Sequence, residues 1–359
     1  MRVLAPVWAI GAVAALLMGC AGPASAPVAR IAHEWSYRAD DYIRSRALVA
    51  ERAVYVGADD NHLYAVSADG QLLWRAETDD NITSTPVQVG DALVFGSWDG
   101  FVYCLAAGDG SLRWRYATGG WVTASPVLAD ELLFIGSYDG YLRALSTRGD
   151  LQWQYATNGR IEAAAAISDG RIYFGSADDS VYALNRSDGS LMWRYRTGGD
   201  VITTPAITDD TVYVGSTDRR LYALAADTGV ERWTFEAAYA IESSPVVAGG
   251  AVYVGANDGQ IYALDTRHGR VIWRARTGGA VRGALATGHG LLFAGSDDGA
   301  LYALDLGTGQ TVWSYQTGGP IVAGPSIADD RLVLASIDRY LTVFGLSDEP
   351  TSSEEGAPQ

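Results

Sequence analysis

Lysine is absent from this sequence of 359 residues, because all 26 of its basic residues are arginine. The absence excludes a Schiff-base lysine and the phosphate-binding lysine of a Walker motif. The basic residues are outnumbered by 42 acidic ones, which gives the chain a formal net charge of −16. Because nucleic acids are bound through basic surfaces, we expect no nucleic-acid partner.

Cysteine and histidine are scarce as well. The two cysteines, Cys20 and Cys104, lie far apart in the sequence and form no adjacent pair. The four histidines have no spacing typical of metal ligands and are His33, His62, His268 and His289. Nor does the spacing of serine, histidine and acidic residues indicate a nucleophilic triad. We therefore expect no metal site, no cofactor and no catalytic residue.

The N-terminus carries one long apolar run, Val3–Met18, which follows Arg2. The run is too short and wrongly flanked for a membrane span, so residues 1–20 are interpreted as an export signal. The sequence Leu17-Met18-Gly19-Cys20 resembles a bacterial lipobox, which implies that Cys20 is lipidated, for example with palmitate. Ala21 follows Cys20 in place of aspartate, and this resembles lipoproteins that are sorted to the outer membrane. The alternative is an ordinary secretory signal with a chance cysteine.

The rest of the chain repeats itself. Tryptophans recur every 39 or 40 residues, at Trp35, Trp74, Trp114, Trp153, Trp193, Trp233, Trp273 and Trp313. A second marker resembles Gly-Ser-x-Asp, and its aspartates are Asp60, Asp99, Asp139, Asp178, Asp218, Asp258, Asp298 and Asp338. Both markers count eight units of about 40 residues, a period that indicates a repeat architecture. An aspartate before glycine in a tight turn bonds its own backbone, so we interpret this column as structural.

Each unit contains four short runs that predict strands. In one copy they are Ser244–Ala248, Ala251–Gly255, Gln260–Leu264 and Val271–Arg276, with Gly, Asp or Asn between them. Four antiparallel strands per unit describe the blade of a β-propeller. We find no amphipathic run long enough for a helical repeat. The sequence therefore predicts an all-β, eight-bladed propeller of four-stranded blades.

The two ends of the repeat array complement each other. The last unit has no tryptophan strand, whereas Ala32–Arg38 is a tryptophan strand with no preceding three strands. We expect the N-terminal strand to complete the eighth blade and to close the ring, which removes the exposed sheet edges. The predicted propeller spans residues 32–346. A tether (residues 21–31) precedes it, and a disordered acidic tail (residues 347–359) follows it.

The repeated phrase Ala303–Trp313, ALDLGTGQTVW, resembles the tryptophan-docking motif of quinoprotein-type propellers, with PQQ-like repeats. The resemblance covers essentially all of residues 32–344. We interpret the eight tryptophans as a structural girdle, in which each indole packs against backbone at a blade boundary. Cys104 occupies a column that other repeats fill with alanine, so we expect a buried, inert thiol.

One column of varied residues is expected to face the central channel. It lies thirteen residues before each marker glycine, or before Ala335 in the eighth unit, and is assigned to the innermost strand. It reads Arg44, Thr83, Thr123, Glu162, Ile202, Glu242, Arg282 and Val322. The two columns after it hold mostly Ser, Thr, Ala or Gly. Arg44, Glu162, Glu242 and Arg282 are candidates for a small polar ligand site at the channel mouth. The alternative is a solvated, charge-balanced pore rim.

Three aromatic residues depart from the repeat pattern. Trp98 and Tyr138 precede the marker aspartates of adjacent units, and Trp121 lies in the segment that joins those units. Strand alternation places all three on one face, where they could form a patch that binds a protein partner. The alternative is that each ring folds down and caps its own blade, because exposed apolar clusters are uncommon on monomers.

The lipobox, the length and the number of repeats resemble the BamB family of outer-membrane protein assembly factors. The resemblance implies a monomeric, lipid-anchored, periplasm-facing scaffold that binds proteins of the outer-membrane assembly machinery. One alternative is a sensor that binds a sugar or another small polar ligand at the channel mouth. The other is a pyrroloquinoline quinone-dependent dehydrogenase, a family in which many members use adjacent cysteines that this chain lacks.

Overall fold

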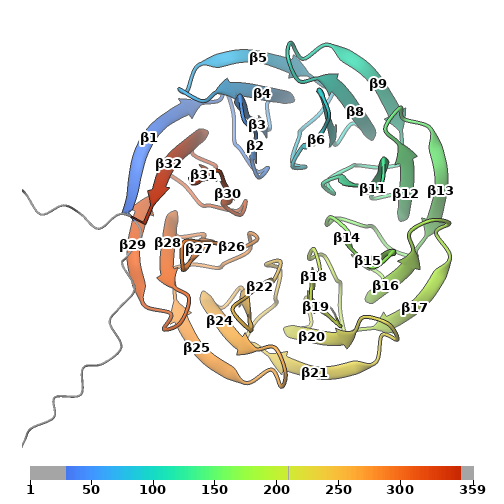
Figure 1. Ribbon diagram of the computed structural model, residues 1–359, viewed down its shortest axis with the longest axis vertical. Helices are drawn as coiled ribbons and strands as arrows, with labels where there is room; N and C mark the ends of the chain where they lie inside the picture. The colour runs from blue at the N-terminus through green and yellow to red at the C-terminus, as the bar shows by residue number, and fades with distance from the viewer. Residues whose placement is uncertain (1–29, 209, 349–359) are drawn as a thin grey trace, which may run out of the picture.

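The protein is a ring of eight four-stranded antiparallel sheets, seen in a computed structural model that describes residues 30–208 and 210–348 (Figure 1). This confirms the predicted eight-bladed propeller. Each blade runs outward from the central axis, and successive blades follow one another around the ring (Figure 1). Cys20, the export signal and nearly all of the expected tether and tail lie outside the described residues.

The strands occupy four equivalent positions in the blades. The innermost strands are β2 (Leu48–Val49), β6 (Val87–Val89), β10 (Val127–Ala129), β14 (Ala166–Ser168), β18 (Ala206–Ile207), β22 (Val246–Ala248), β26 (Ala286–Gly288) and β30 (Ser326–Ala328). The second strands are β3 (Ala53–Gly57), β7 (Ala92–Gly96), β11 (Leu132–Gly136), β15 (Arg171–Ser176), β19 (Thr211–Gly215), β23 (Ala251–Gly255), β27 (Leu291–Gly295) and β31 (Arg331–Ala335).

The two outer positions complete each blade. The third strands are β4 (His62–Ser67), β8 (Phe101–Ala106), β12 (Tyr141–Ser146), β16 (Ser180–Asn185), β20 (Arg220–Ala225), β24 (Gln260–Asp265), β28 (Ala300–Asp305) and β32 (Tyr340–Ser347). The outermost strands are β5 (Leu72–Glu77), β9 (Leu112–Ala117), β13 (Leu151–Ala156), β17 (Leu191–Arg196), β21 (Glu231–Glu236), β25 (Val271–Arg276), β29 (Thr311–Gln316) and β1 (Arg30–Arg38).

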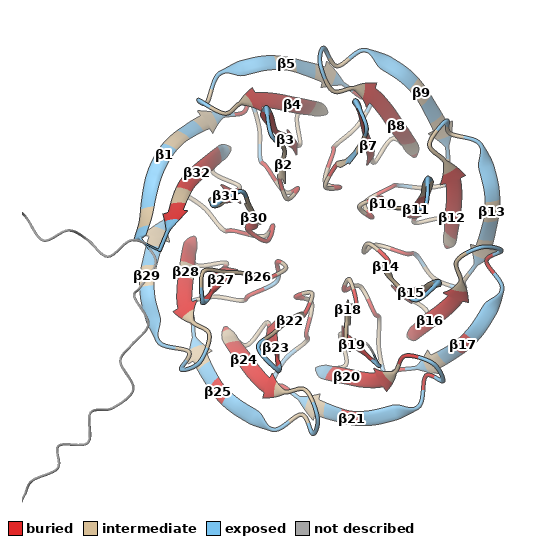
Figure 2. Ribbon diagram, viewed as in Figure 1, coloured by how far each residue is buried: buried red, intermediate tan, exposed pale blue. Residues whose placement is uncertain are grey.

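Burial follows strand position. The second and third strands are buried on both faces between neighbouring blades, as in β7, and carry the apolar runs of the repeat (Figure 2). The outermost strands, such as β9, alternate exposed and half-buried residues, because only one of their faces contacts the ring (Figure 2). The core is therefore divided among the interfaces between blades.

The ring closes through the N-terminal strand. β1 pairs antiparallel with β32, so that Trp35 lies opposite Val343, and this confirms the expected closure of the last blade. β1 begins at Arg30, inside the expected tether, and β32 ends at Ser347, the first residue of the expected tail.

The marker glycines make room for the next blade. A Cβ placed on Gly255 would lie 2.2 Å from Cγ1 of Val281, a residue of the following blade that is fully buried. The same close approach occurs between Gly57 and Ile82, at 2.3 Å. Val281 and Ile82 stand fourteen residues before a marker glycine, in a column that holds Ile or Val in all eight units. The glycine column and this Ile or Val column are thus the two sides of one contact between blades.

The tryptophans also join neighbouring blades. The indole Nε1 of Trp153 in β13 donates a hydrogen bond to the Arg186 carbonyl in the next blade, at 3.1 Å. Gly189, with a φ of 70°, lies against this ring, and a Cβ there would be 2.6 Å from Cε3 of Trp153. Equivalent bonds are made by Trp35, Trp74, Trp114, Trp193, Trp233 and Trp273. Trp313, next to the closing blade, has no such acceptor among residues 30–208 and 210–348.

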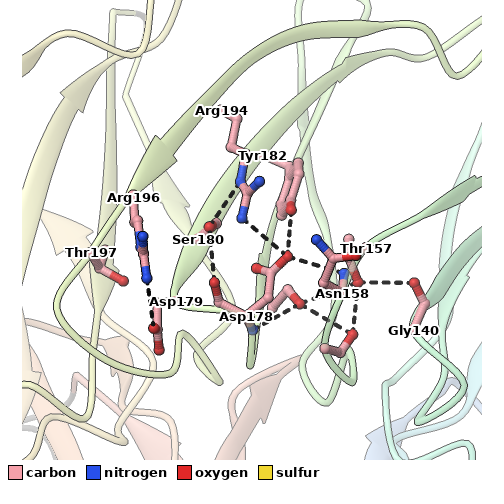
Figure 3. Close-up of polar contacts among 12 residues, drawn as sticks. Gly140, Thr157, Asn158, Asp178, Asp179, Ser180, Tyr182, Arg194, Arg196 and Thr197 are labelled. Atoms are coloured by element: carbon pink, nitrogen blue, oxygen red, sulfur yellow. Dashed lines mark hydrogen bonds and ion pairs between the residues drawn. The ribbon is translucent and has the colours of Figure 1, made fainter.

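The aspartate column is a second connection between blades (Figure 3). Oδ2 of Asp178 accepts from the Tyr182 hydroxyl at 2.5 Å and from the backbone N–H of Asn158 at 3.1 Å. Asn158 lies in the connection that leaves the preceding blade, so one carboxylate ties two blades together. Backbone N–H groups are bound in the same way by Asp99, Asp139, Asp218, Asp258, Asp298 and Asp338.

Candidate functional site at the channel mouth

The channel-facing column does not lie on the innermost strands, and this part of the sequence prediction is wrong. Arg44 and its equivalents lie in the extended connections that precede β2 and the other innermost strands. In the first blade, the side chain of Ser45 supplies the hydrogen bonds to Gly57 that the backbone of a neighbouring strand would otherwise make. Its hydroxyl donates to the Gly57 carbonyl and accepts from the Gly57 N–H, both at 2.9 Å. The inner segment is therefore held by a side chain rather than by a strand ladder.

The connections surround a central cavity of about 710 Å³. Of the four predicted mouth residues, Arg44, Glu162 and Arg282 line this cavity, whereas Glu242 lies outside its lining. Glu242 nevertheless contacts Arg282, with Nη1 and Oε2 separated by 3.7 Å. The ring therefore brings the predicted residues to one rim, although it does not gather them into a single cluster.

Each charge at the mouth already has a partner within the protein. Arg44 pairs with Asp59 at 2.7 Å, and Arg282 pairs with Asp297 at 2.9 Å. Both carboxylates occupy the position directly before a marker aspartate, so the pairing follows from the turn of the same blade. Because these guanidiniums are neutralised locally, their charge contributes little to binding a ligand from solvent.

The three out-of-pattern aromatic residues form one continuous stack. The rings of Trp98 and Trp121 are nearly parallel, with centroids 4.6 Å apart and an interplanar angle of 14°. Trp121 also packs against Tyr138, with centroids 5.3 Å apart. Trp121 is 44% exposed, whereas Trp98 and Tyr138 are half-buried. The stack thus presents one exposed indole that is held on both sides by its neighbours.

Hydrogen bonds join this aromatic stack to the channel mouth. Nε1 of Trp98 donates to Oγ1 of Thr83 at 2.9 Å, and the Tyr138 hydroxyl donates to Oε2 of Glu162 at 3.0 Å. Burial raises the pKa of Tyr138 to about 12, and the Glu162 carboxylate adds to the rise, so the hydroxyl keeps its proton at neutral pH. The sequence suggested two separate sites, but the structure combines them into one surface.

Arginines lie over both ends of the stack. The Arg44 guanidinium lies 5.1 Å from the centroid of the Trp98 ring, and that of Arg160 lies 5.7 Å from the Tyr138 centroid. Arg160 also pairs with Glu162 and, at 3.3 Å, with Asp200. These contacts fix the outer rings, because a cation within about 6 Å of an aromatic face is attracted to it. We call the surface formed by Trp98, Trp121, Tyr138, Arg44 and Arg160 the aromatic arc.

Sequence reasoning missed two residues of this region. Arg160 was not singled out, although it occupies the same column as Trp121, fifteen residues before its marker glycine. Arg46 was not singled out either, although it stands in a column that otherwise holds Thr85, Ser125, Ala164, Thr204, Ser244, Ala284 and Gly324. Both arginines stand out from their columns when the eight units are aligned position by position.

Searches for two other kinds of site gave no candidate. In the described ranges, no group of three or more His, Cys, Asp or Glu side chains is arranged to hold a metal ion. Over these same residues, no helix is long and apolar enough to cross a membrane.

The sequence matches the family described as outer membrane protein assembly factor BamB over residues 59–166, 149–280 and 258–349. These segments cover most of the propeller. The chain belongs to the BamB family. No curated protein is significantly similar to it in sequence.

Solved structures show the same fold. BamB from Moraxella catarrhalis superposes with a TM-score of 0.76 at 22% identity, over 88% of this chain and 98% of that one. The computationally designed Ika8 protein gives a TM-score of 0.77 at 18% identity, over 88% and 99% of the two chains. The quinohemoprotein alcohol dehydrogenase ADHIIG from Pseudomonas putida HK5 gives 0.75 at 15%, over 92% and 78%. An assembly factor, a designed protein and an enzyme thus share this ring, so the fold alone does not assign an activity.

Proposed function

We propose that this BamB-family propeller is a protein-binding scaffold in the assembly of outer-membrane β-barrel proteins. In this proposal, Cys20 carries the lipid anchor, the ring faces the periplasm as a monomer, and the partner belongs to the outer-membrane assembly machinery. We propose no catalytic role. The observation that carries the proposal is the aromatic arc, with its exposed and preorganised Trp121.

The geometry of Trp121 suits a binding anchor. Its indole is 44% exposed, yet it is stacked against Trp98 at 4.6 Å and packs at a tilt of 45° against Tyr138 at 5.3 Å. Stacking restricts the rotamers of the ring before a partner arrives, which lowers the entropic cost of binding. Aromatic residues in such positions dominate the energetics of many protein interfaces.

The surroundings of the arc support the same interpretation. Arg44 and Arg160 flank the stack and are each paired with a carboxylate, so a partner would not have to bury an unpaired charge. The half-buried groups of the stack also have partners, since Trp98 and Tyr138 donate to Thr83 and Glu162. The polar groups beneath Trp121 are thus already hydrogen-bonded, and its exposed face is apolar.

The test is a pull-down of the tagged, full-length protein from its own cell envelope in mild detergent, followed by mass spectrometry. We expect recovery of a barrel-assembly protein. Trp121→Ala is expected to weaken the interaction with that protein about thirtyfold, since truncation of an aromatic anchor costs about 2 kcal/mol.

The matched control is Tyr239→Ala. Tyr239 is 63% exposed and lies in the equivalent connection of another blade, outside the aromatic arc. The control should bind the partner like the wild type. Equal binding by folded Trp121→Ala protein would overturn the role of the arc. Failure to recover any barrel-assembly protein with the wild type would overturn the scaffold function itself.

A further inference from the structure

One cation in the central cavity has no acidic partner. Arg46 lines the cavity below Arg44, and its Nη2 donates to the Pro325 carbonyl of the closing blade at 2.7 Å. Its Nε makes no hydrogen bond. Among the described residues, no carboxylate forms an ion pair with Arg46, in contrast to Arg44 and Arg282 at the mouth.

The lack of a carboxylate partner matters because Arg46 is partly removed from solvent. Burial within the ring lowers the pKa of Arg46, yet a guanidinium remains charged in proteins at neutral pH. A half-buried cation without a counter-ion loses part of its hydration, and one carbonyl satisfies only one of the five N–H donors of the guanidinium. Nε is buried, whereas the remaining Nη donors are available to an anion that enters from solvent.

Arg46 carries the unpaired charge of the cavity lining. The other ionisable residues of the lining, Arg44, Arg282 and Glu162, pair with Asp59, Asp297 and Arg160, respectively. Among the described residues, the lining therefore presents one cation without a counter-ion. Such a cation favours an anionic ligand locally.

The other blades supply hydroxyl groups at the level of Arg46. The Ser125 hydroxyl accepts from the Thr85 backbone N–H at 2.9 Å, and the Ser244 hydroxyl accepts from the Thr204 N–H at 3.0 Å. No described residue accepts a hydrogen bond from either serine hydroxyl. Because their oxygens already act as acceptors, their O–H groups are left as donors toward the channel. Donors are what an anion requires.

The cavity also has the size and the mixed surface of a site for an organic molecule. Its volume of about 710 Å³ falls in the range of small-molecule pockets. Leu285, Val322 and Ile327 add apolar surface to the lining. Next to Pro325, Gly324 packs closely against the neighbouring blade, since a Cβ there would lie 2.1 Å from the Ala284 carbonyl oxygen.

We propose that Arg46 anchors a binding site for a small organic carboxylate in the central channel, with the hydroxyls of Thr85, Ser125, Thr204 and Ser244 as further donors. A planar carboxylate matches the fork of a guanidinium, and the apolar wall contacts the carbon skeleton. This site differs from the predicted mouth site in its anchor, because the charges of Arg44, Glu162 and Arg282 are already paired. It is independent of the scaffold function.

The experiment is titration calorimetry of the full chain with succinate, citrate and benzoate at constant ionic strength. Succinamide, which has the shape of succinate without its charge, and inorganic phosphate are the comparison ligands. We expect at least one carboxylate to bind, and succinamide not to bind. Arg46→Gln should weaken the binding roughly tenfold or more, as expected for the loss of a charged hydrogen-bonding partner.

Two further variants make the outcome decisive. Arg113→Gln is the matched control, because Arg113 pairs with Asp91 on the outside of the ring and lies outside the cavity lining. It should leave binding unchanged. Thr85→Val combined with Thr204→Val removes two hydroxyls, preserves side-chain shape and leaves Arg46 in place, so it tests the site even if Arg46→Gln fails to fold. We expect this double variant to weaken binding severalfold.

Three results would overturn the proposal. The first is the absence of binding by all three carboxylates at tens of millimolar. The second is unchanged binding by folded Arg46→Gln protein or, if that variant does not fold, by the double variant. The third is phosphate binding as tight as that of every carboxylate, which would show a site for inorganic anions rather than for organic carboxylates.

Discussion

Trp153 and Trp313 of the girdle differ in one indole hydrogen bond. We predict from this that replacing each by phenylalanine lowers the free energy of unfolding by different amounts. Nε1 of Trp153 donates to the Arg186 carbonyl at 3.1 Å. Trp313 has no carbonyl acceptor in the described part of the chain, because the closing blade lacks the turn that supplies one elsewhere. Both indoles are half-buried and contact a phenylalanine, Trp153 at 5.7 Å and Trp313 at 5.3 Å. We therefore expect Trp153→Phe to cost more stability than Trp313→Phe.

The magnitude follows from the contacts. Both substitutions remove a similar apolar area, which costs about 1 kcal/mol in each case. Only Trp153→Phe also removes a hydrogen bond and leaves a carbonyl without its donor, which adds about 1 kcal/mol. The expected losses are therefore about 2 kcal/mol for Trp153→Phe and about 1 kcal/mol for Trp313→Phe.

The assay is equilibrium urea unfolding followed by far-UV circular dichroism, a signal that does not depend on the tryptophan removed. The two variants should have equal m-values, so that the difference in midpoint reports a difference in free energy of unfolding. Unfolding followed by a second probe must coincide with the first, because a ring of blades need not unfold in one step. Equal losses in the two variants, or a larger loss for Trp313→Phe, would refute the role assigned to the indole hydrogen bond.

Three other predictions concern single positions. Gly255→Ala should lower the yield of folded protein or its thermal stability, because the new Cβ would lie 2.2 Å from Val281, and an unchanged melting temperature would contradict this contact. The hydrogen bond to Asp348 raises the pKa of His289, so the histidine stabilises the fold below its unfolded pKa and loses this effect as the pH rises through its folded pKa. His289→Asn, which suits the φ of 52°, should therefore cost more stability at pH 5.5 than at pH 8 in thermal melts. Burial raises the pKa of Cys104 to about 11, so iodoacetamide should modify this thiol only in unfolded protein, as mass spectrometry would show.

The inner columns of the repeat explain why the ring offers two different surfaces. The Ile or Val column and the glycine column serve the packing of one blade against the next, so they are nearly uniform, with Ala335 as the one exception in the glycine column. The column of Arg44 and that of Arg46 face the channel, where packing does not dictate the residue. These two columns, together with the columns of Trp98 and of Trp121, vary from blade to blade, and their variation produces the aromatic arc and the cavity around Arg46.

The sequence alone determined the architecture. The repeat length, the four runs per unit and the complementary ends predicted eight blades and the closing strand, because each blade is a local unit that repeats the same packing. In the unit of residues 244–276, β23 and β25 match their predicted bounds, and β22 begins two residues later than predicted. It begins at the same position as β14 and β26, which follow Ala165 and Leu285 in place of Pro245.

Only the tertiary structure decided how the channel-facing residues combine. Trp98, Trp121 and Tyr138 were expected on one face, but their stacking depends on the spacing of adjacent blades around the ring. The pairs Arg44–Asp59 and Arg282–Asp297 and the unpaired Arg46 were not predictable, since they arise from side-chain conformations on connections rather than on strands. A periodic sequence specifies which residues occupy equivalent positions. It does not specify which side chains meet between neighbouring blades, such as Arg160 and Asp200, because those distances are set by the closed ring.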